Sequence, residues 1–87
     1  MNKRELLVQF DPDATHRILI GAPETGSPML DLMILLEAVG CLATVIRNQG
    51  SNEIEGKSLD TWIHNQLNKH MSEYNNSKTF SVVKSPN

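Results

Sequence analysis

The stretch "SPMLDLMILLEAVGCLATVIRNQG", residues 27–50, decides the fold because it is the longest apolar segment of the chain. Ser27 suits the N-cap of a helix and Pro28 suits its first position. Gly50 is the kind of residue that follows a helix end. These end signals predict a single long helix over residues 28–49.

This predicted helix is apolar around most of its circumference. At 100° per residue, five of its residues gather into one narrow stripe, made of Glu37, Gly40, Thr44, Arg47 and Asn48. The remaining arc covers well over half of the circle. A helix with such a surface is normally buried on all sides, so the sequence demands a large apolar cover.

A second helix is predicted over residues 58–74, after the loop at 51–56, with Ser58 as its N-cap. Its apolar face covers about a third of the circle. The members of that face are Leu59, Trp62, Ile63, Leu67, Met71 and Tyr74. This ordinary amphipathic pattern predicts a helix that packs antiparallel to the first one.

The N-terminal segment contains two short apolar runs, "ELLVQF" at 5–10 and "RILIGA" at 17–22, separated by "DPDATH". The turn chemistry of the intervening residues favours a β-hairpin. A strand followed by a helix that starts at Asp11 is the alternative, because Pro12 also fits a first helical position.

The C-terminal segment "TFSVV", residues 79–83, is predicted to form a last strand, and residues 84–87 a frayed tail. The predicted fold class is therefore α+β: one domain over residues 1–87, with two helices against a small sheet.

A chain of 87 residues offers too little surface to cover the apolar arc of helix 28–49. Each exposed Leu or Ile forgoes roughly 1.5–3 kcal/mol of burial. We therefore expect a homo-oligomer in which this arc forms the interface. The expected interface residues are Met29, Leu32, Met33, Leu35, Leu36, Val39, Leu42, Val45 and Ile46.

Two alternatives to self-association concern the same helix. Tertiary packing covers all of its apolar side chains in the first, and the protein is then a monomer. The helix spans a membrane in the second, since its length approaches the spanning length. Asp31 and Glu37 would each cost a few kcal/mol inside a bilayer, and neither flank carries a strong basic cluster, so we expect no membrane partner.

Composition narrows the classes of function. The chain has 8 basic and 10 acidic residues and a net charge of −2, which disfavours a general nucleic-acid binder. Cys41 is the only cysteine, reads as a small hydrophobic residue of the helix and suits a reducing cytoplasm. No HExxH, CxxC or GxSxG motif is present, so we expect no metal, no cofactor and no enzymatic activity. The predicted function is a cytoplasmic, non-catalytic regulator, inhibitor or assembly factor that binds a protein partner.

The loop over residues 21–28 gives a second hypothesis, a ligand-binding module for a nucleotide or another anion. Thr25, Gly26 and Ser27 precede the N-terminus of helix 28–49, whose free backbone N–H groups attract anions. The spacing matches neither GxGxxG nor the P-loop, and the loop has no lysine.

The segment "EGKSLDTWIHNQL", residues 55–67, resembles the last helix of ribbon–helix–helix repressors, where a Gly-x-Ser-Leu start is common. "ELLVQFDPDATHRIL" is similar to the strand and following helix of the same family. This resemblance implies a DNA-binding dimer as a third hypothesis. Helix 28–49 is extra to that plan, and only Lys3, Arg4 and Gln9 would be available to read a major groove.

Overall fold

The computed structural model describes residues 3–75 and 81–85, which form two helices and five short strands. Their order along the chain is β1 (Leu7–Phe10), β2 (Ile18–Pro23), α1 (Pro28–Asn48), β3 (Glu53–Ile54), β4 (Lys57–Ser58), α2 (Leu59–Asn75) and β5 (Ser81–Ser85). The predicted α+β class with two helices and an N-terminal hairpin is confirmed.

The N-terminal hairpin pairs β1 with β2 in antiparallel fashion, with Phe10 opposite Ile18. Its turn is held by Asp11, whose side-chain Oδ1 accepts a hydrogen bond from the Asp13 N–H at 3.0 Å. An aspartate that bonds the backbone two residues on stabilises a turn in place of a first helical turn. The hairpin is therefore correct, and the helix that a ribbon–helix–helix plan requires directly after the first strand does not form.

The main sheet has the order β1-β2-β5, and β5 runs parallel to β2. The predicted last strand exists but lies two residues later than expected, and residues 79–80 are outside the described part. Lys84 and Ser85 were expected in a frayed tail, and they instead pair with Ala22 and Pro23. The end of β2 supplies backbone partners to these two residues, which is why the strand continues. Residues 86–87 are outside the described part.

Both helices begin where their capping residues predicted. The Ser27 Oγ accepts a hydrogen bond from the Leu30 N–H at 3.4 Å, and the Ser58 Oγ accepts one from the Thr61 N–H at 3.3 Å. Gly50 follows the end of α1 with a φ of 90°. These local interactions explain why the helix bounds were readable from the sequence.

The segment between the helices is not the plain loop that we predicted at 51–56. It contains the two-stranded ladder β3–β4, in which Glu53 lies opposite Ser58 and Ile54 opposite Lys57. The two residues between the strands, Glu55 and Gly56, both have positive φ, at 54° and 77°. Two positive values are typical of a type I′ hairpin turn, for which Asn-Gly is the common signal.

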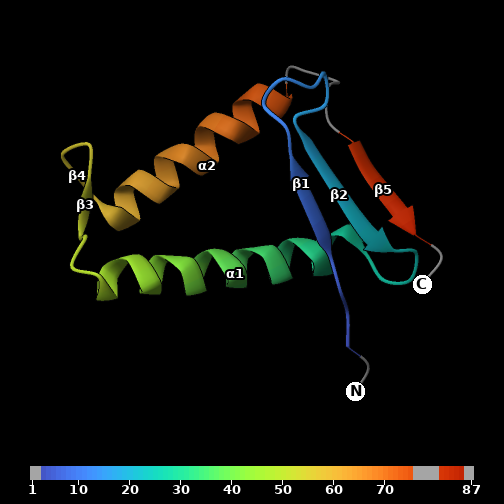
Figure 1. The fold of residues 1–87 in the computed structure, drawn as a ribbon, viewed down its shortest axis with the longest axis horizontal. Helices are drawn as coiled ribbons and strands as arrows, with labels where there is room; N and C mark the ends of the chain where they lie inside the picture. The colour runs from blue at the N-terminus through green and yellow to red at the C-terminus, as the bar shows by residue number, and fades with distance from the viewer. Residues whose placement is uncertain (1–2, 76–80, 86–87) are drawn as a thin grey trace.

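The two helices and the sheet form the three sides of an open triangle (Figure 1). Each of the three arginines of the chain pairs with a carboxylate on a different side of the triangle: Arg4 of the N-terminal segment with α1, Arg47 of α1 with α2, and Arg17 of the hairpin with α2. The paired nitrogen and oxygen atoms are 2.7 Å apart in Arg4–Asp31 and Arg47–Asp60, and 3.3 Å apart in Arg17–Glu73. Polar contacts between residues distant in sequence thus hold the sides of the triangle together.

The triangle encloses very little core. Within residues 3–75, Ala22 and Leu59 are the only apolar side chains that are buried. The radius of gyration is 15.0 Å, whereas a compact domain of this length has about 12 Å. The accessible surface is 7010 Å², roughly 1,900 Å² more than a compact monomer of this mass exposes. The chain by itself therefore leaves twelve large apolar side chains exposed to water within residues 3–75.

Candidate functional site: the exposed apolar surface of α1

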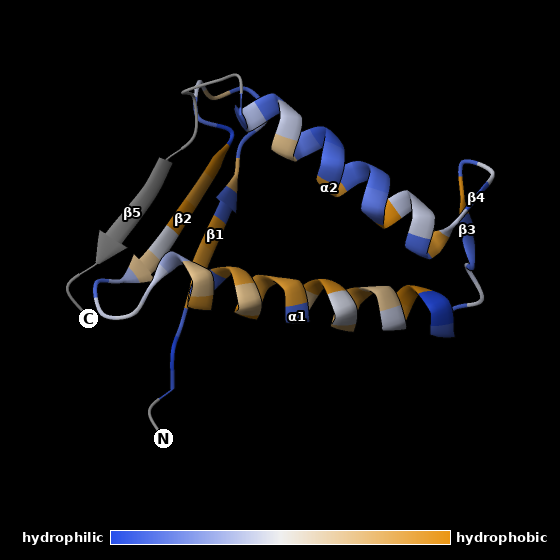
Figure 2. Ribbon diagram, turned by 180° about the vertical axis from the view of Figure 1, so that it is seen from behind, coloured by the Kyte–Doolittle hydropathy of each residue, from blue (hydrophilic) through white to orange (hydrophobic). Residues whose placement is uncertain are grey.

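Helix α1 touches the rest of its own chain along two narrow faces. In its first half, buried Asp31 and half-buried Ile34 and Leu35 share one face by their spacing. In its second half, Val39 and Ile46 are half-buried. Figure 2 shows α1 as apolar over nearly its whole length, while α2 is mostly polar. The contact faces are therefore much narrower than the apolar arc.

An open groove of about 460 Å³ separates the second half of α1 from α2. It is lined by Leu36, Val39, Gly40, Ala43, Thr44 and Arg47 of α1, and by Asp60, Ile63 and His64 of α2. Three of its members, Gly40, Thr44 and Arg47, belong to the polar stripe of the helix. The other three α1 members, Leu36, Val39 and Ala43, belong to the apolar arc, so the border between the polar stripe and the apolar arc faces α2. Much of the apolar arc still faces solvent.

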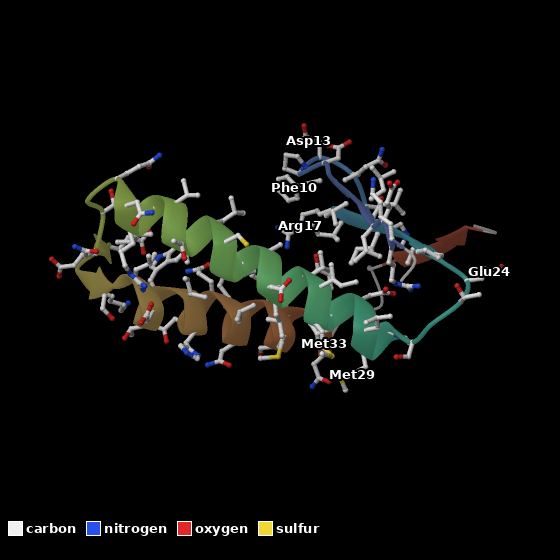
Figure 3. All side chains as sticks on the ribbon, turned by 90° about the horizontal axis from the view of Figure 1, so that it is seen from below. Phe10, Asp13, Arg17, Glu24, Met29 and Met33 are labelled. Atoms are coloured by element: carbon white, nitrogen blue, oxygen red, sulfur yellow. The ribbon has the colours of Figure 1, made fainter. Side chains whose placement is uncertain are left out.

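Six of the nine expected interface residues are exposed. Four of them follow the spacing i, i+3, i+4, i+7 and form one continuous strip of helix surface, which we call the N-terminal stripe. Their exposed fractions are 64% for Met29, 50% for Leu32, 60% for Met33 and 45% for Leu36. Met29 and Met33 lie on the side of α1 away from the sheet (Figure 3).

The other two exposed members, Leu42 and Val45, lie in the second half of α1 and have exposed fractions of 65% and 51%. The remaining expected interface residues, Leu35, Val39 and Ile46, are half-buried within the chain itself. The structure thus divides the predicted interface into six residues that are free to contact another molecule and three that also serve the intramolecular packing.

Strand β1 adds exposed apolar side chains that the sequence interpretation missed. Leu7 is 60% exposed and Phe10 is 64% exposed, and Val8 between them is also exposed. The sequence did contain a sign of this exposure, because "LLV" lacks the apolar–polar alternation of a strand that has one solvent-exposed face. Such a run indicates a strand that needs cover on both faces.

The loop at 21–28, our candidate anion site, is occupied by a side chain of the protein itself. The Arg4 Nη1 donates a hydrogen bond to the Thr25 carbonyl oxygen, and a Cβ on Gly26 would lie 2.9 Å from the same nitrogen. The Arg4 Nε donates to Asp31 Oδ1 at 2.8 Å. Thr25, Gly26 and Ser27 are all exposed, but the nearby positive charge is matched by Asp31. Arg4 is therefore engaged by Asp31 and the Thr25 carbonyl and is not open to an incoming anion.

The corner between the hairpin and α2 is a surface cluster of charges. The Glu73 Oε2 lies 3.3 Å from both Arg17 Nη2 and His70 Nδ1. The hydrogen bond from His70, reinforced by the positive charges of His70, Arg17 and Lys69, lowers the pKa of Glu73 below its ordinary value of 4.5. Such a cluster resembles a structural tie more than an acid–base pair for catalysis.

This lowered pKa predicts a pH-dependent contribution of Glu73 to stability. Because the pKa is lower in the folded chain, the contribution is present above pH 4.5 and is lost as the pH falls through the folded pKa. We expect Glu73→Gln to be less stable than the wild type at pH 7, and the difference to shrink as the pH falls below 4.5, measured by urea denaturation. A stability difference that persists unchanged at the low pH would contradict this assignment.

Other chemistry-bearing residues are scattered. Within residues 3–75 and 81–85, no three His, Cys, Asp or Glu side chains lie close enough together to hold a metal ion. Cys41 is exposed on α1 and is not packed as the small hydrophobic residue that we expected. By its position on the helix, Cys41 lies on the side of α1 opposite Val39 and Ile46, the half-buried residues of the same half.

By length and composition, α1 is also long and apolar enough to cross a membrane, and it is the one such helix among the described residues. No model of a known protein family matches the chain, and no curated protein or solved structure is significantly similar to it, so its function must be argued from the arrangement of its own residues.

Proposed function

We propose that this protein is a small, non-catalytic homo-oligomer that assembles through the apolar surface of α1 and acts by binding a protein partner. One observation carries the proposal: α1 leaves the N-terminal stripe, Leu42 and Val45 exposed to solvent. A regulator, an inhibitor or an assembly factor of the cytoplasm fits this surface.

The free energy available from burying the exposed apolar side chains of α1 favours assembly over a free monomer. Six large apolar side chains on one helix, each worth roughly 1.5–3 kcal/mol on burial, are substantial against the 5–15 kcal/mol that stabilises a typical domain. A standard interface buries about 800 Å² of each partner. The surplus surface of this chain exceeds that area about twofold, so it has room for a self-contact and for a partner protein.

The chemistry of the surface favours a protein as its partner. The N-terminal stripe has the i, i+3, i+4, i+7 spacing by which helices dock against other helices or grooves. It carries no charge, and the arginines that could attract a nucleic acid are paired with carboxylates. We therefore place protein binding before nucleic-acid and anion binding.

A membrane-spanning α1 is the alternative that its composition allows, and the triangle argues against it. Arg47 pairs with Asp60 at the far end of α1, and from there α2 runs back toward the sheet. A bilayer around α1 would therefore also surround the polar side chains of α2, such as Asn65 and Lys69. Transferring each of them into the hydrocarbon core would cost on the order of a few kcal/mol. This arrangement favours docking to protein.

Multi-angle light scattering at low micromolar concentration tests the proposal. The chain mass is 9.7 kDa, and we expect a mass that is a whole multiple of this value, for protein purified without detergent. A monomer mass would overturn the proposed assembly. Recovery of the protein only from detergent-extracted membranes would favour the spanning helix instead.

A further inference from the structure

Strand β1 has a free edge. Within the part of the chain that the structure describes, β1 pairs with β2 alone and lies at the end of the order β1-β2-β5. The Asp11 N–H donates to the Arg17 carbonyl at 2.9 Å, and antiparallel ladders bond through alternate residue pairs. The backbone groups of Gln9 therefore face β2, whereas those of Val8 and Phe10 point out of the sheet at the free edge.

This edge lacks the features by which monomeric proteins protect themselves from strand pairing. Charged side chains, prolines and bulges usually protect exposed edges. The sequence of β1, "LVQF", contains no charge and no proline, and all four of its residues are exposed. Its apolar side chains also project on both faces, with Leu7 on one face and Val8 and Phe10 on the other.

We propose that β1 pairs antiparallel with β1 of a second copy across a two-fold axis, which joins two three-stranded sheets into one sheet of six strands. This inference rests on the self-association proposed above and assigns the contact through which two copies meet. An antiparallel pair of identical strands is self-complementary, so a single edge serves both copies.

Charge selects the register of this pair. Because Leu6, Val8 and Phe10 carry the outward backbone groups, only registers that place these residues opposite one another form hydrogen bonds. With Leu7 opposite Leu7 of the second copy, Lys3 faces Asp11 and Glu5 faces Gln9. With Val8 opposite Val8, Glu5 faces Asp11, and like charges directly opposite each other are destabilising. The geometry thus points to the register centred on Leu7.

The free edge of β1 and the second half of α1 lie on the same side of the sheet (Figure 1). Arg4, just before β1, pairs with Asp31 of α1, and from there α1 continues past the free edge toward β3 and β4 (Figure 1). A strand added to that edge lies on the same side as the second half of α1, which exposes Leu42 and Val45. The edge and the helix then contribute to one interface, and the N-terminal stripe stays open to a partner protein.

Cysteine cross-linking tests the register. We replace Cys41 with serine and introduce Leu7→Cys, which places two thiols at a non-hydrogen-bonded pair with Cα atoms about 4.5 Å apart, within disulfide range. The matched control is Gln9→Cys on the same face of β1, where the two Cα atoms would be about 13 Å apart. Under mild oxidation we expect at least tenfold more disulfide-linked dimer from Leu7→Cys. Equal yields, or no dimer from either variant, would overturn the pairing.

A proline variant provides the second test. Val8→Pro removes an outward N–H that β2 does not use, so the chain keeps its own ladder and loses a bond to the second copy. We expect it to weaken self-association at least tenfold, while Val8→Ala, which keeps the N–H, weakens it less. If the wild type assembles but Val8→Pro assembles equally well, the edge pairing is wrong and the proposed assembly through α1 stands. A monomeric wild type overturns both.

Discussion

Replacing Asp31 with asparagine is expected to lower the free energy of unfolding by about 3–5 kcal/mol, the cost of leaving one member of a buried ion pair unpaired. Asp31 and Arg4 are the most deeply buried ion pair of the described residues, with side chains only 9% and 15% exposed. The Arg4 Nη2 lies 2.7 Å from Asp31 Oδ1, and the Nε donates a hydrogen bond to the same oxygen. The substitution would leave a mostly buried guanidinium without its counter-charge.

The consequence would reach beyond the pair, because Arg4 also ties the N-terminal segment to the loop before α1 through the Thr25 carbonyl. A loss of this size would bring a small domain close to half-unfolded, since total stabilities are only 5–15 kcal/mol. Urea denaturation followed by the fluorescence of Trp62, the single tryptophan, measures the effect. All variants should be compared at one protein concentration, because assembly couples to stability.

Asp60→Asn is the matched control for Asp31→Asn. The Arg47–Asp60 pair has the same 2.7 Å distance, but its side chains are 51% and 73% exposed. Water and salt screen exposed pairs, so the control should cost less than about 1 kcal/mol. Equal effects of the two substitutions would show that burial does not set the contribution of the Arg4–Asp31 pair to stability.

Replacing Leu42 with glutamate is expected to convert the assembled protein to monomers. Leu42 is 65% exposed in the single chain, so a carboxylate at this position is solvated in the monomer and does not disturb its packing. In the assembly, the same carboxylate would be buried without a partner in every copy, at a cost of about 1–3 kcal/mol or more each. Two copies per interface then weaken association by at least about thirtyfold.

Light scattering over a dilution series measures this change, and circular dichroism shows whether the helices persist. Asn65→Glu is the control, because it adds the same charge at an exposed position of α2, away from the apolar surface. We expect this variant to keep the mass of the wild type. A Leu42→Glu protein that remains fully assembled would remove α1 from the interface, whatever the outcome at β1.

The sequence by itself determined the elements of this protein and the extent of its apolar surface. The ends of α1 and the start of α2 were readable because their caps depend on residues within three or four positions, such as Ser27 with Leu30 and Ser58 with Thr61. The Asp11 turn was equally local. The β3–β4 ladder was missed because Glu55 is not among the residues that usually adopt positive φ.

Only the tertiary structure decided which way α1 faces and what joins the three sides of the triangle. A helix that is apolar around most of its circumference has many orientations of similar burial, so its pattern did not reveal that Gly40 and Thr44 would face α2. The arginine pairs join residues 13, 27 and 56 positions apart. No local signal encodes such pairs, because their partners meet only after the helices and the sheet have been placed.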